Sequence, residues 1–558
     1  MFRPRQLREV TSPWLEEPEC WQEALTGVEG AGPTVSSHSC SGTNEIVWLQ
    51  LSKVQWTKLH FTELQSTGVA LARGFVGRAA ELGRLGVILG RVGDPARDLP
   101  GVALMLRGRR RVGKSRLVEV FCERSGLPFL FFQASQGATP AAGRAAFADA
   151  IRWSDLPGKD LFADGVAWPS WSSFFRQLAV ALPDDQPSIV VIDELPWLLE
   201  SDEALEGELQ TAWDRLLSRK PVLLILIGSD LARPFHQRAA VMVLPPLNPV
   251  EVGDLLGLGP ADALDAYLVT GGLPLICQEW RHGTGLREFL RSALGDPTSA
   301  LLVSGERSLA AEFPAEMQAR AVLAAIGNGE RTWTGIQDEL TDDDGRRIAD
   351  SSLSIALRSL EAKRVIAVDV PLSAKSGERD KRYRVADPYL RFYLAFLRGG
   401  LPLVERGRGD IVLLTIDRSW GTWRGRAVEP VIRDALLRIA PDLGYPEVAD
   451  VGGWWNRQHN PEIDIVAKSD TRDAALSFAG SIEWREKRGF GRREYADLLR
   501  DLRSVAGANE QTPLLAVTRT GTADDAVPIR CLGPEDVLGA WPREPASPPR
   551  ELLSDKHP

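Results

Sequence analysis

The stretch that decides the fold is GRRRVGKS at residues 108–115. It fits the pattern G-x-x-x-x-G-K-[ST] at every fixed position, and chains with this pattern wrap a loop around phosphate groups. An apolar run at 102–106 precedes it and an apolar-rich run at 117–121 follows it, so the loop is expected to join a strand to a helix. The residues expected to hold the ligand along this loop are Gly108, Arg109, Arg110, Arg111, Val112, Gly113, Lys114, Ser115 and Arg116.

Each fixed residue of the loop has a chemical reason. The glycines let backbone N–H groups curl around a phosphate, and the following helix directs its positive end at the same anion. Lys114 supplies a mobile charge for the outer phosphates, and the Ser115 hydroxyl is a ligand for magnesium. The loop therefore predicts ATP and Mg²⁺ as cofactors.

Two carboxylates follow the apolar run at 189–192, namely Asp193 and Glu194. Four apolar residues ending in acids are typical of a central strand that delivers carboxylates to the carboxyl edge of a sheet, where the phosphate loop must also lie. Asp193 is expected in the magnesium shell, and Glu194 is expected to accept a proton from the water that attacks the γ-phosphate.

The next apolar run, at 222–227, is followed by Ser229 and Arg238. Ser229 can hydrogen-bond the γ-phosphate or the attacking water, and its structural alternative is a helix cap. Arg238 can supply charge to the transition state, as arginine fingers do, or it can be an ordinary surface arginine. Both alternatives stay open for each residue.

Strands that alternate with helices over the first half predict an α/β fold, with a parallel sheet covered on both faces. The pattern changes near residue 246, where it becomes helical, and again near 314. We expect a poorly ordered extension (1–72), a P-loop ATPase core (73–245), a helical lid (246–313), a winged helix (314–400), a separate α/β domain (401–540) and a tail (541–558).

The winged helix-turn-helix is predicted from three helical patterns, at 317–326, 333–340 and 351–361, followed by strand patterns at 365–370 and 382–385. The region between and beside these strands carries basic residues that suit DNA phosphates. Acidic residues dilute this charge, and winged helices also join proteins. Double-stranded DNA and a protein partner are therefore both open. The basic residues are Lys363, Arg364, Lys375, Arg379, Lys381, Arg382 and Arg384.

Composition excludes several classes of protein. The formal net charge of −9 over 558 residues argues against a generally basic protein that coats nucleic acid. Five scattered cysteines without a C-x-x-C pair indicate neither a disulfide framework nor a zinc site. We find no apolar run of about eighteen residues, so no membrane association is expected and the predicted location is cytoplasmic.

Several short motifs together resemble the archaeal-type ATPases, P-loop proteins near the AAA+ and STAND groups. They are FVGR at 75–78, the phosphate loop, VIDE at 191–194, LIGS at 226–229, GGLP at 271–274 and YRVADPYLRFY at 383–393. The resemblance covers residues 73 to about 500. It implies that Gly77 and Arg78 pack near the nucleotide base and that Arg238 is the arginine after the Gly-Ser strand, although the family's usual Gly-Arg is replaced by His236-Gln237-Arg238.

The same resemblance implies a PD-(D/E)xK nuclease-like fold for the last domain, whose acids would converge on a metal. Glu429 fits the acid of the first helix and Asp464 the strand aspartate. The third element fails, because the expected acid and lysine positions hold Ser481 and Glu483, or Glu483 and Arg485 in the alternative register. A vestigial site at Glu429, Asp464 and Glu483 is the expectation, within a domain that binds rather than cuts.

The sequence thus predicts a magnesium-dependent switch ATPase that acts on DNA or on a regulatory complex. Two alternatives remain open: a signalling scaffold that binds protein through its winged helix and last domain, and an ATP-gated DNA nuclease. A homo-oligomer is also open.

Overall fold

The structure is a computed structural model that describes residues 75–542 apart from 76, 164, 229–237, 313–316, 328, 342–344, 373–379, 459, 470–474 and 522–526. The expectations for residues 1–72, for the tail beyond 542 and for Ser229 lie outside the described residues. Residues from Gly74 onward form one compact unit. No described helix is both long and apolar enough to span a bilayer.

A five-stranded sheet, in which each neighbouring pair of strands is parallel, carries the phosphate loop. Its order is β2-β3-β4-β1-β5, so the first strand of the chain lies inside the sheet between β4 and β5. This confirms the predicted α/β class and the parallel sheet. The strands are β1 (Val102–Arg107), β2 (Phe129–Gln133), β3 (Ser188–Asp193), β4 (Val222–Ile227) and β5 (Ala240–Val243).

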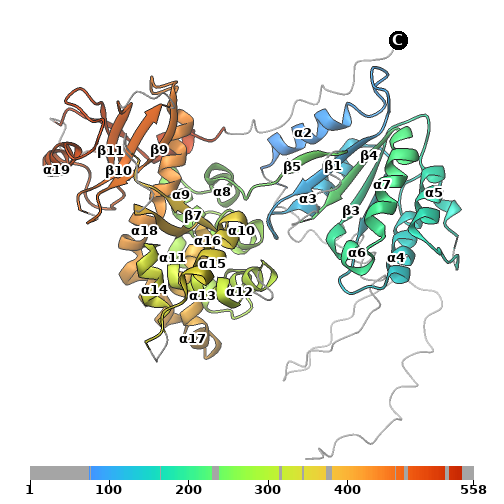
Figure 1. Cartoon of the computed structure of the whole chain (residues 1–558), viewed down its shortest axis with the longest axis horizontal. Helices are drawn as coiled ribbons and strands as arrows, with labels where there is room; N and C mark the ends of the chain where they lie inside the picture. The colour runs from blue at the N-terminus through green and yellow to red at the C-terminus, as the bar shows by residue number, and fades with distance from the viewer. Residues whose placement is uncertain are drawn as a thin grey trace, which may run out of the picture. The chain divides into compact units, whose positions relative to one another are not determined.

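Helices cover both faces of this sheet because its central strands are apolar on both sides. Alternate residues of one strand enter different cores: Leu104 packs with α2 and α3, whereas Met105 packs with α4, α5 and α7 (Figure 1). The helices are α2 (Ala79–Leu89), α3 (Lys114–Ser125), α4 (Pro140–Arg152), α5 (Trp171–Ala181), α6 (Leu195–Ser201) and α7 (Leu205–Arg215), with 3-10 turns at Lys159–Leu161 and Leu217–Arg219.

Five helices follow the sheet, in the segment predicted as a lid. Three of them carry proline near their first turn, where the missing N–H costs nothing, and the first is closed by a capping box between Asn248 and Glu251. They are α8 (Pro249–Leu256), α9 (Pro260–Thr270), α10 (Pro274–Glu279), α11 (Leu286–Leu294) and α12 (Ala300–Glu312).

Three helices and a small antiparallel sheet come next, at nearly the predicted bounds. The sheet has the order β6-β8-β7. Helices and hairpin in this order suit a winged helix, which stays a prediction. The elements are α13 (Met317–Ile326), β6 (Glu330–Arg331), α14 (Trp333–Glu339), α15 (Asp350–Ala362), β7 (Ile366–Asp369) and β8 (Arg382–Val385).

A helical stretch then leads to the longest described helix, α18 (Gly409–Ile439). The chain passes through α16 (Pro388–Phe392), a π-helix η5 (Tyr393–Leu397), a 3-10 turn η6 (Arg398–Gly400) and α17 (Leu401–Glu405). A π-helix is rare and often lies beside a functional site.

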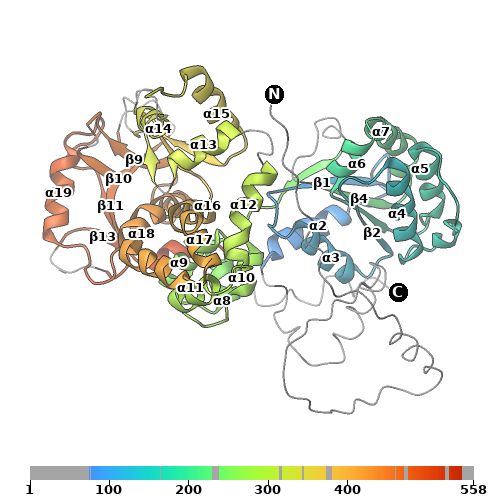
Figure 2. The ribbon, with the colours of Figure 1, turned by 90° about the horizontal axis from the view of Figure 1, so that it is seen from below.

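The last part of the chain is a mixed five-stranded sheet of order β13-β12-β11-β10-β9, antiparallel among β9, β10 and β11 and parallel beyond. Helix α18 covers one face and α19 the other (Figure 2). The elements are β9 (Val448–Trp455), β10 (Glu462–Ser469), β11 (Phe478–Glu483), α19 (Arg492–Leu502), β12 (Leu514–Thr518), β13 (Arg530–Leu532) and α20 (Pro534–Gly539).

Candidate functional site

The phosphate loop connects β1 to α3, as the sequence predicts. Gly108 has φ 149°, and a Cβ there would lie 2.5 Å from the carbonyl oxygen of Leu244, so only glycine fits. Gly113 has φ 88° and caps α3 in the left-handed region. Both glycines thus have a backbone conformation that other residues rarely adopt, and phosphate-binding loops use such glycines to turn backbone N–H groups toward the anion.

Lys114 lies across the opening of this loop. Its Nζ donates to the carbonyl oxygens of Gly108 at 2.8 Å and Arg109 at 3.0 Å, so the ammonium is held within the loop. Burial lowers the pKa of Lys114, while the carboxylates of Glu194 and Asp193 oppose this shift. A phosphate at the loop would place further negative charge beside this ammonium and favour its charged form.

Ser115 and Asp193 meet at the carboxyl edge of the sheet. The Ser115 hydroxyl donates to Oδ2 of Asp193 at 2.7 Å, and the backbone N–H of Glu194 donates to Oδ1 at 2.9 Å. Burial raises the pKa of Asp193 against both hydrogen bonds. A hydroxyl and a carboxylate at this distance are the hard oxygen ligands that suit Mg²⁺ when phosphate oxygens complete its shell.

Glu194 follows in an unusual backbone conformation, with φ 52° as the N-cap of α6. Burial, and then the charge of Asp193, raise its pKa. Left-handed backbone at a non-glycine residue costs about 1 kcal/mol or more and tends to occur where function needs it. At Glu194 the chain leaves the extended conformation of β3. The raised pKa of Glu194 suits a carboxylate that accepts a proton.

Arg78 is buried and joins the loop to the helices that follow the sheet. Its Nη2 donates to the carbonyl oxygen of Val112 at 3.1 Å, and its backbone N–H donates to Oε1 of Glu251 at 3.0 Å. A Cβ at Gly77 would lie 2.9 Å from the same Glu251 atom. Gly77 and Arg78 thus contact the loop region, and their predicted role at the nucleotide base stays a prediction.

Sequence reasoning missed Glu251. Its other oxygen, Oε2, accepts from the backbone N–H of Asn248 at 2.7 Å, so one carboxylate closes the capping box of α8 and holds the Arg78 backbone. The signal was present in the sequence, since asparagine followed three residues later by glutamate marks a helix start. The contact of Glu251 with Arg78, 173 residues earlier in the chain, is not indicated by any local pattern in the sequence.

The remaining predicted residues have varied surroundings. Arg109 forms an ion pair with Asp387, and Arg110 lies close enough to Lys114 to lower its pKa. Arg116 is exposed on α3 and pairs with Glu119 at 3.2 Å, a helix-surface contact that directs it along the helix.

Arg238 is exposed, and its Nε donates to both oxygens of Asp214 on α7, at 2.9 and 3.1 Å. In this conformation the Arg238 guanidinium is bound to Asp214, so it could act as an arginine finger only if this ion pair broke. That role stays a prediction.

The expected vestigial nuclease residues are only partly gathered. Asp464 and Glu483 line one cavity of about 360 Å³, whereas Glu429 is not among its lining residues and pairs with Arg433 at 3.0 Å. Asp464 accepts from Ser481 and from the backbone N–H of Ile482, and burial raises its pKa.

Glu483 is neutralised by Arg485, at 2.6 Å, which also contacts Glu494 at 3.2 Å. The cavity has four further acids that were not singled out in the sequence: Glu462 on β10, and Glu494, Asp497 and Asp501 on α19. Among the described residues, no group of three or more histidine, cysteine or acidic side chains is placed to hold a metal ion.

Comparison with known proteins gives distant likenesses. Residues 393–493 match a family described as archaea bacterial proteins of unknown function. An uncharacterised protein of Methanocaldococcus jannaschii is 22% identical over 427 residues, which cover 72% of this chain and 86% of that protein.

Two solved structures resemble parts of the chain. The Walker-type ATPase of Pyrococcus abyssi shares 20% identity over 58% of this chain and 97% of its own, with a TM-score of 0.40. The Orc1 protein of Aeropyrum pernix, solved in complex with DNA, shares 17% identity over 63% of this chain and 97% of its own, with a TM-score of 0.30.

Proposed function

We propose that this chain is a magnesium-dependent ATPase that works as a switch. The observation that carries the proposal is the hydrogen bond from the Ser115 hydroxyl to Oδ2 of Asp193, at 2.7 Å. It lies at the end of a loop that has the glycines and the lysine of a phosphate-binding motif. A glycine turn without a ligand-binding role would not be expected to place a hydroxyl of the following helix against a carboxylate of another strand.

Each residue has one role in this proposal. The loop and Lys114 bind the β- and γ-phosphates, and Ser115 and Asp193 hold Mg²⁺, which supplies positive charge to the phosphates. Glu194 accepts a proton from the attacking water. Such a reaction is carried almost entirely by positioning and charge, so the place that the backbone gives to the Glu194 carboxylate is part of its proposed role.

The test is ATP turnover by the wild-type protein and by Lys114→Ala and Glu194→Gln, each with and without Mg²⁺. We expect Lys114→Ala to lose nucleotide binding, and Glu194→Gln to bind ATP but turn it over roughly 100-fold or more slowly. Chelation of Mg²⁺ should stop turnover in the wild type. Glu200→Gln, which changes an exposed acid on the neighbouring α6, is the matched control and should leave turnover unchanged. Equal turnover in all four proteins would refute the proposal.

The proposed output of the switch is DNA or a regulatory complex, with DNA as the first candidate. Lys363 and Arg364, directly after α15, are exposed as a phosphate contact requires. Two other residues of the predicted basic wing are engaged elsewhere: Arg382 pairs with Glu462 and Arg384 pairs with Asp369.

Duplex DNA should therefore stimulate ATP hydrolysis, and its binding should weaken steeply as salt rises. Lys363→Glu with Arg364→Glu should reduce both effects. If DNA neither binds at low salt nor changes turnover, while ATP drives self-association, the protein-binding scaffold replaces this output.

The nuclease alternative depends on Asp464 and Glu483, which share a cavity. It requires Mg²⁺- or Mn²⁺-dependent nicking that disappears in Asp464→Ala. Because Arg485 neutralises Glu483 where a lysine would contact the scissile phosphate, we expect no nicking in the wild type.

A further inference from the structure

A cavity lined by several arginines lies far along the sequence from the phosphate loop. It has a volume of about 920 Å³ and is bordered by the segment around β6 and α14, by β8, by α16 with the π-helix, by α18 and by β10. Five arginines line it, against a single acid: Arg331, Arg382, Arg391, Arg418, Arg426 and Glu462. Five positive charges and one negative leave the described lining at +4, in a chain whose net charge is −9. Arg331 also lies 3.6 Å from Glu339, which is not part of the lining.

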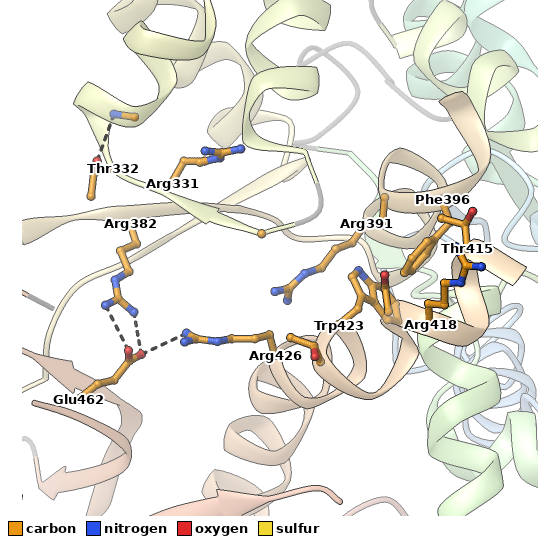
Figure 3. Close-up of a pocket in the computed structure, with 15 residues that line it drawn as sticks. Arg331, Thr332, Arg382, Arg391, Phe396, Thr415, Arg418, Trp423, Arg426 and Glu462 are labelled. Carbon is orange, nitrogen blue, oxygen red and sulfur yellow. Dashed lines mark hydrogen bonds and ion pairs between the residues drawn. The ribbon is translucent and has the colours of Figure 1, made fainter. Parts of the chain in front are cut away.

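The single carboxylate neutralises two of these arginines only in part. Glu462 accepts from Arg382 at 2.7 Å and lies 3.6 Å from Arg426 (Figure 3). Arg382 is buried, and its guanidinium also stacks on Trp455, 4.0 Å from the ring centroid. The ion pair and the stacking together fix the position of Arg382 at one edge of the cavity.

Arg391 and Arg418 add charge from the helical side. Arg391 is 3% exposed, and Figure 3 shows it extending from α16 toward the space bordered by Arg382, Arg426 and Glu462. Arg418 on α18 is exposed and makes no ion pair within the described part of the chain. Like charges held around one space repel each other, and an anion between them removes the repulsion.

Aromatic side chains form part of the wall. Trp423 lines the cavity and is 6% exposed, so its ring gives the arginines an apolar neighbour, while its indole Nε1 is buried behind that surface. The π-helix Tyr393–Leu397 contributes Phe396 to the same wall.

We propose that this cavity binds a ligand with two or more phosphate groups. Guanidinium groups recognise phosphate by paired hydrogen bonds, and the volume suits a ligand of nucleotide size better than a single phosphate ion. A free nucleoside di- or triphosphate and the phosphorylated end of a nucleic-acid strand share this chemistry. The site is separate from the phosphate loop, and its lining does not include Lys363 or Arg364, although Arg382 of the predicted basic wing borders it.

The test is calorimetric titration with inorganic tripolyphosphate in Lys114→Ala protein, in which the phosphate loop is disabled. We expect one site. Reversing the two exposed arginines together, Arg418→Glu with Arg426→Glu, should weaken binding at least about tenfold, since each charged contact contributes about 1.5–3 kcal/mol. Glu462→Gln should tighten binding, because it removes the only described acid of the lining.

The matched control reverses Arg398 and Arg406, which are equally exposed and lie outside the lining. It changes the net charge by the same amount and should leave tripolyphosphate affinity within about twofold. Absence of binding in the Lys114→Ala protein, or equal weakening by both pairs of reversals, would overturn the proposal. Thermal unfolding of each variant shows whether it is folded.

Competition identifies the source of the phosphates. ATP is compared with a short DNA oligomer that carries a 5′-phosphate and with the same oligomer lacking it. Displacement by ATP alone assigns a free nucleotide, and displacement by the phosphorylated oligomer alone assigns a strand end. Equal displacement by both oligomers, with no effect of ATP, would indicate ordinary backbone binding and contradict a cavity built for a terminal polyphosphate.

Discussion

Single residues of the phosphate loop have little freedom to change. Gly108 combines φ 149° with a would-be Cβ 2.5 Å from the Leu244 carbonyl oxygen. We expect Gly108→Ala to lose ATP binding and to lower the melting temperature, because the loop or the chain at Leu244 must move. Gly207→Ala is the control: it is exposed inside α7 with nothing within 4 Å, and it should stabilise the fold slightly. Unchanged nucleotide affinity in Gly108→Ala would show that the loop tolerates another path.

Glu251 is the residue whose role only the structure reveals. It holds the backbone N–H groups of Arg78 and Asn248 with its two oxygens. We expect Glu251→Ala to weaken ATP binding severalfold and to lower stability by about 1–2 kcal/mol, from loss of the helix cap and of a buried acceptor. Isothermal titration with ATP and chemical denaturation measure the two effects. If stability falls while ATP affinity stays the same, Glu251 caps α8 without positioning the loop.

At the scale of elements, the sequence predicts what depends on local pattern. The strands at 188–193 and 222–227 could be found because both of their faces are buried, which leaves continuous apolar runs. The phosphate loop could be found because its chemistry fixes residue types at fixed spacing. Contacts such as Arg78 with Glu251 could not, because neither residue's neighbours specify a partner. Arg116 is less clear: its place in the motif predicts a ligand contact, which stays a prediction, and its side chain pairs with Glu119 on the helix surface.

Helices α9 and α18 are joined by a buried ion pair, a contact that the local sequence pattern does not specify. Arg424 on α18 is 1% exposed and contacts Asp265 on α9 at 3.1 Å; Arg519 contacts the same carboxylate at 3.2 Å. We expect Asp265→Asn to lower the free energy of unfolding by about 3 kcal/mol, because two guanidinium groups would lose their buried counter-charge.

The control is the exposed pair of Arg287 with Asp417, between α11 and α18. Asp417→Asn should cost less than about 1 kcal/mol. Chemical denaturation of both variants gives the comparison, and equal losses would mean that burial adds nothing to the Asp265 contacts.

Across the whole described molecule, the helices after the sheet share one hydrophobic core with the C-terminal part. Tyr389 is the clearest link. It is fully buried, and its hydroxyl donates to the carbonyl oxygen of Leu301 on α12 at 2.7 Å. It also packs closely on the end of α9, since a Cβ added to Gly271 would lie 2.7 Å from the Cβ of Tyr389. A shared core of this kind makes the predicted lid and the C-terminal helices one cooperative unit, so that nucleotide-dependent movement of the lid would reach α18 directly.

Tyr389→Ala should therefore lower the free energy of unfolding by about 3–5 kcal/mol and speed hydrogen exchange in α9 and in α18 together. Tyr389→Phe keeps the ring and loses one hydrogen bond, so it should cost about 1 kcal/mol, with exchange in both helices rising far less. Hydrogen-exchange mass spectrometry on peptides from the two helices measures the coupling. Faster exchange in α9 with none in α18 would mean that the two helices open independently, and a switch that works through the lid would then need another route to the C-terminal part.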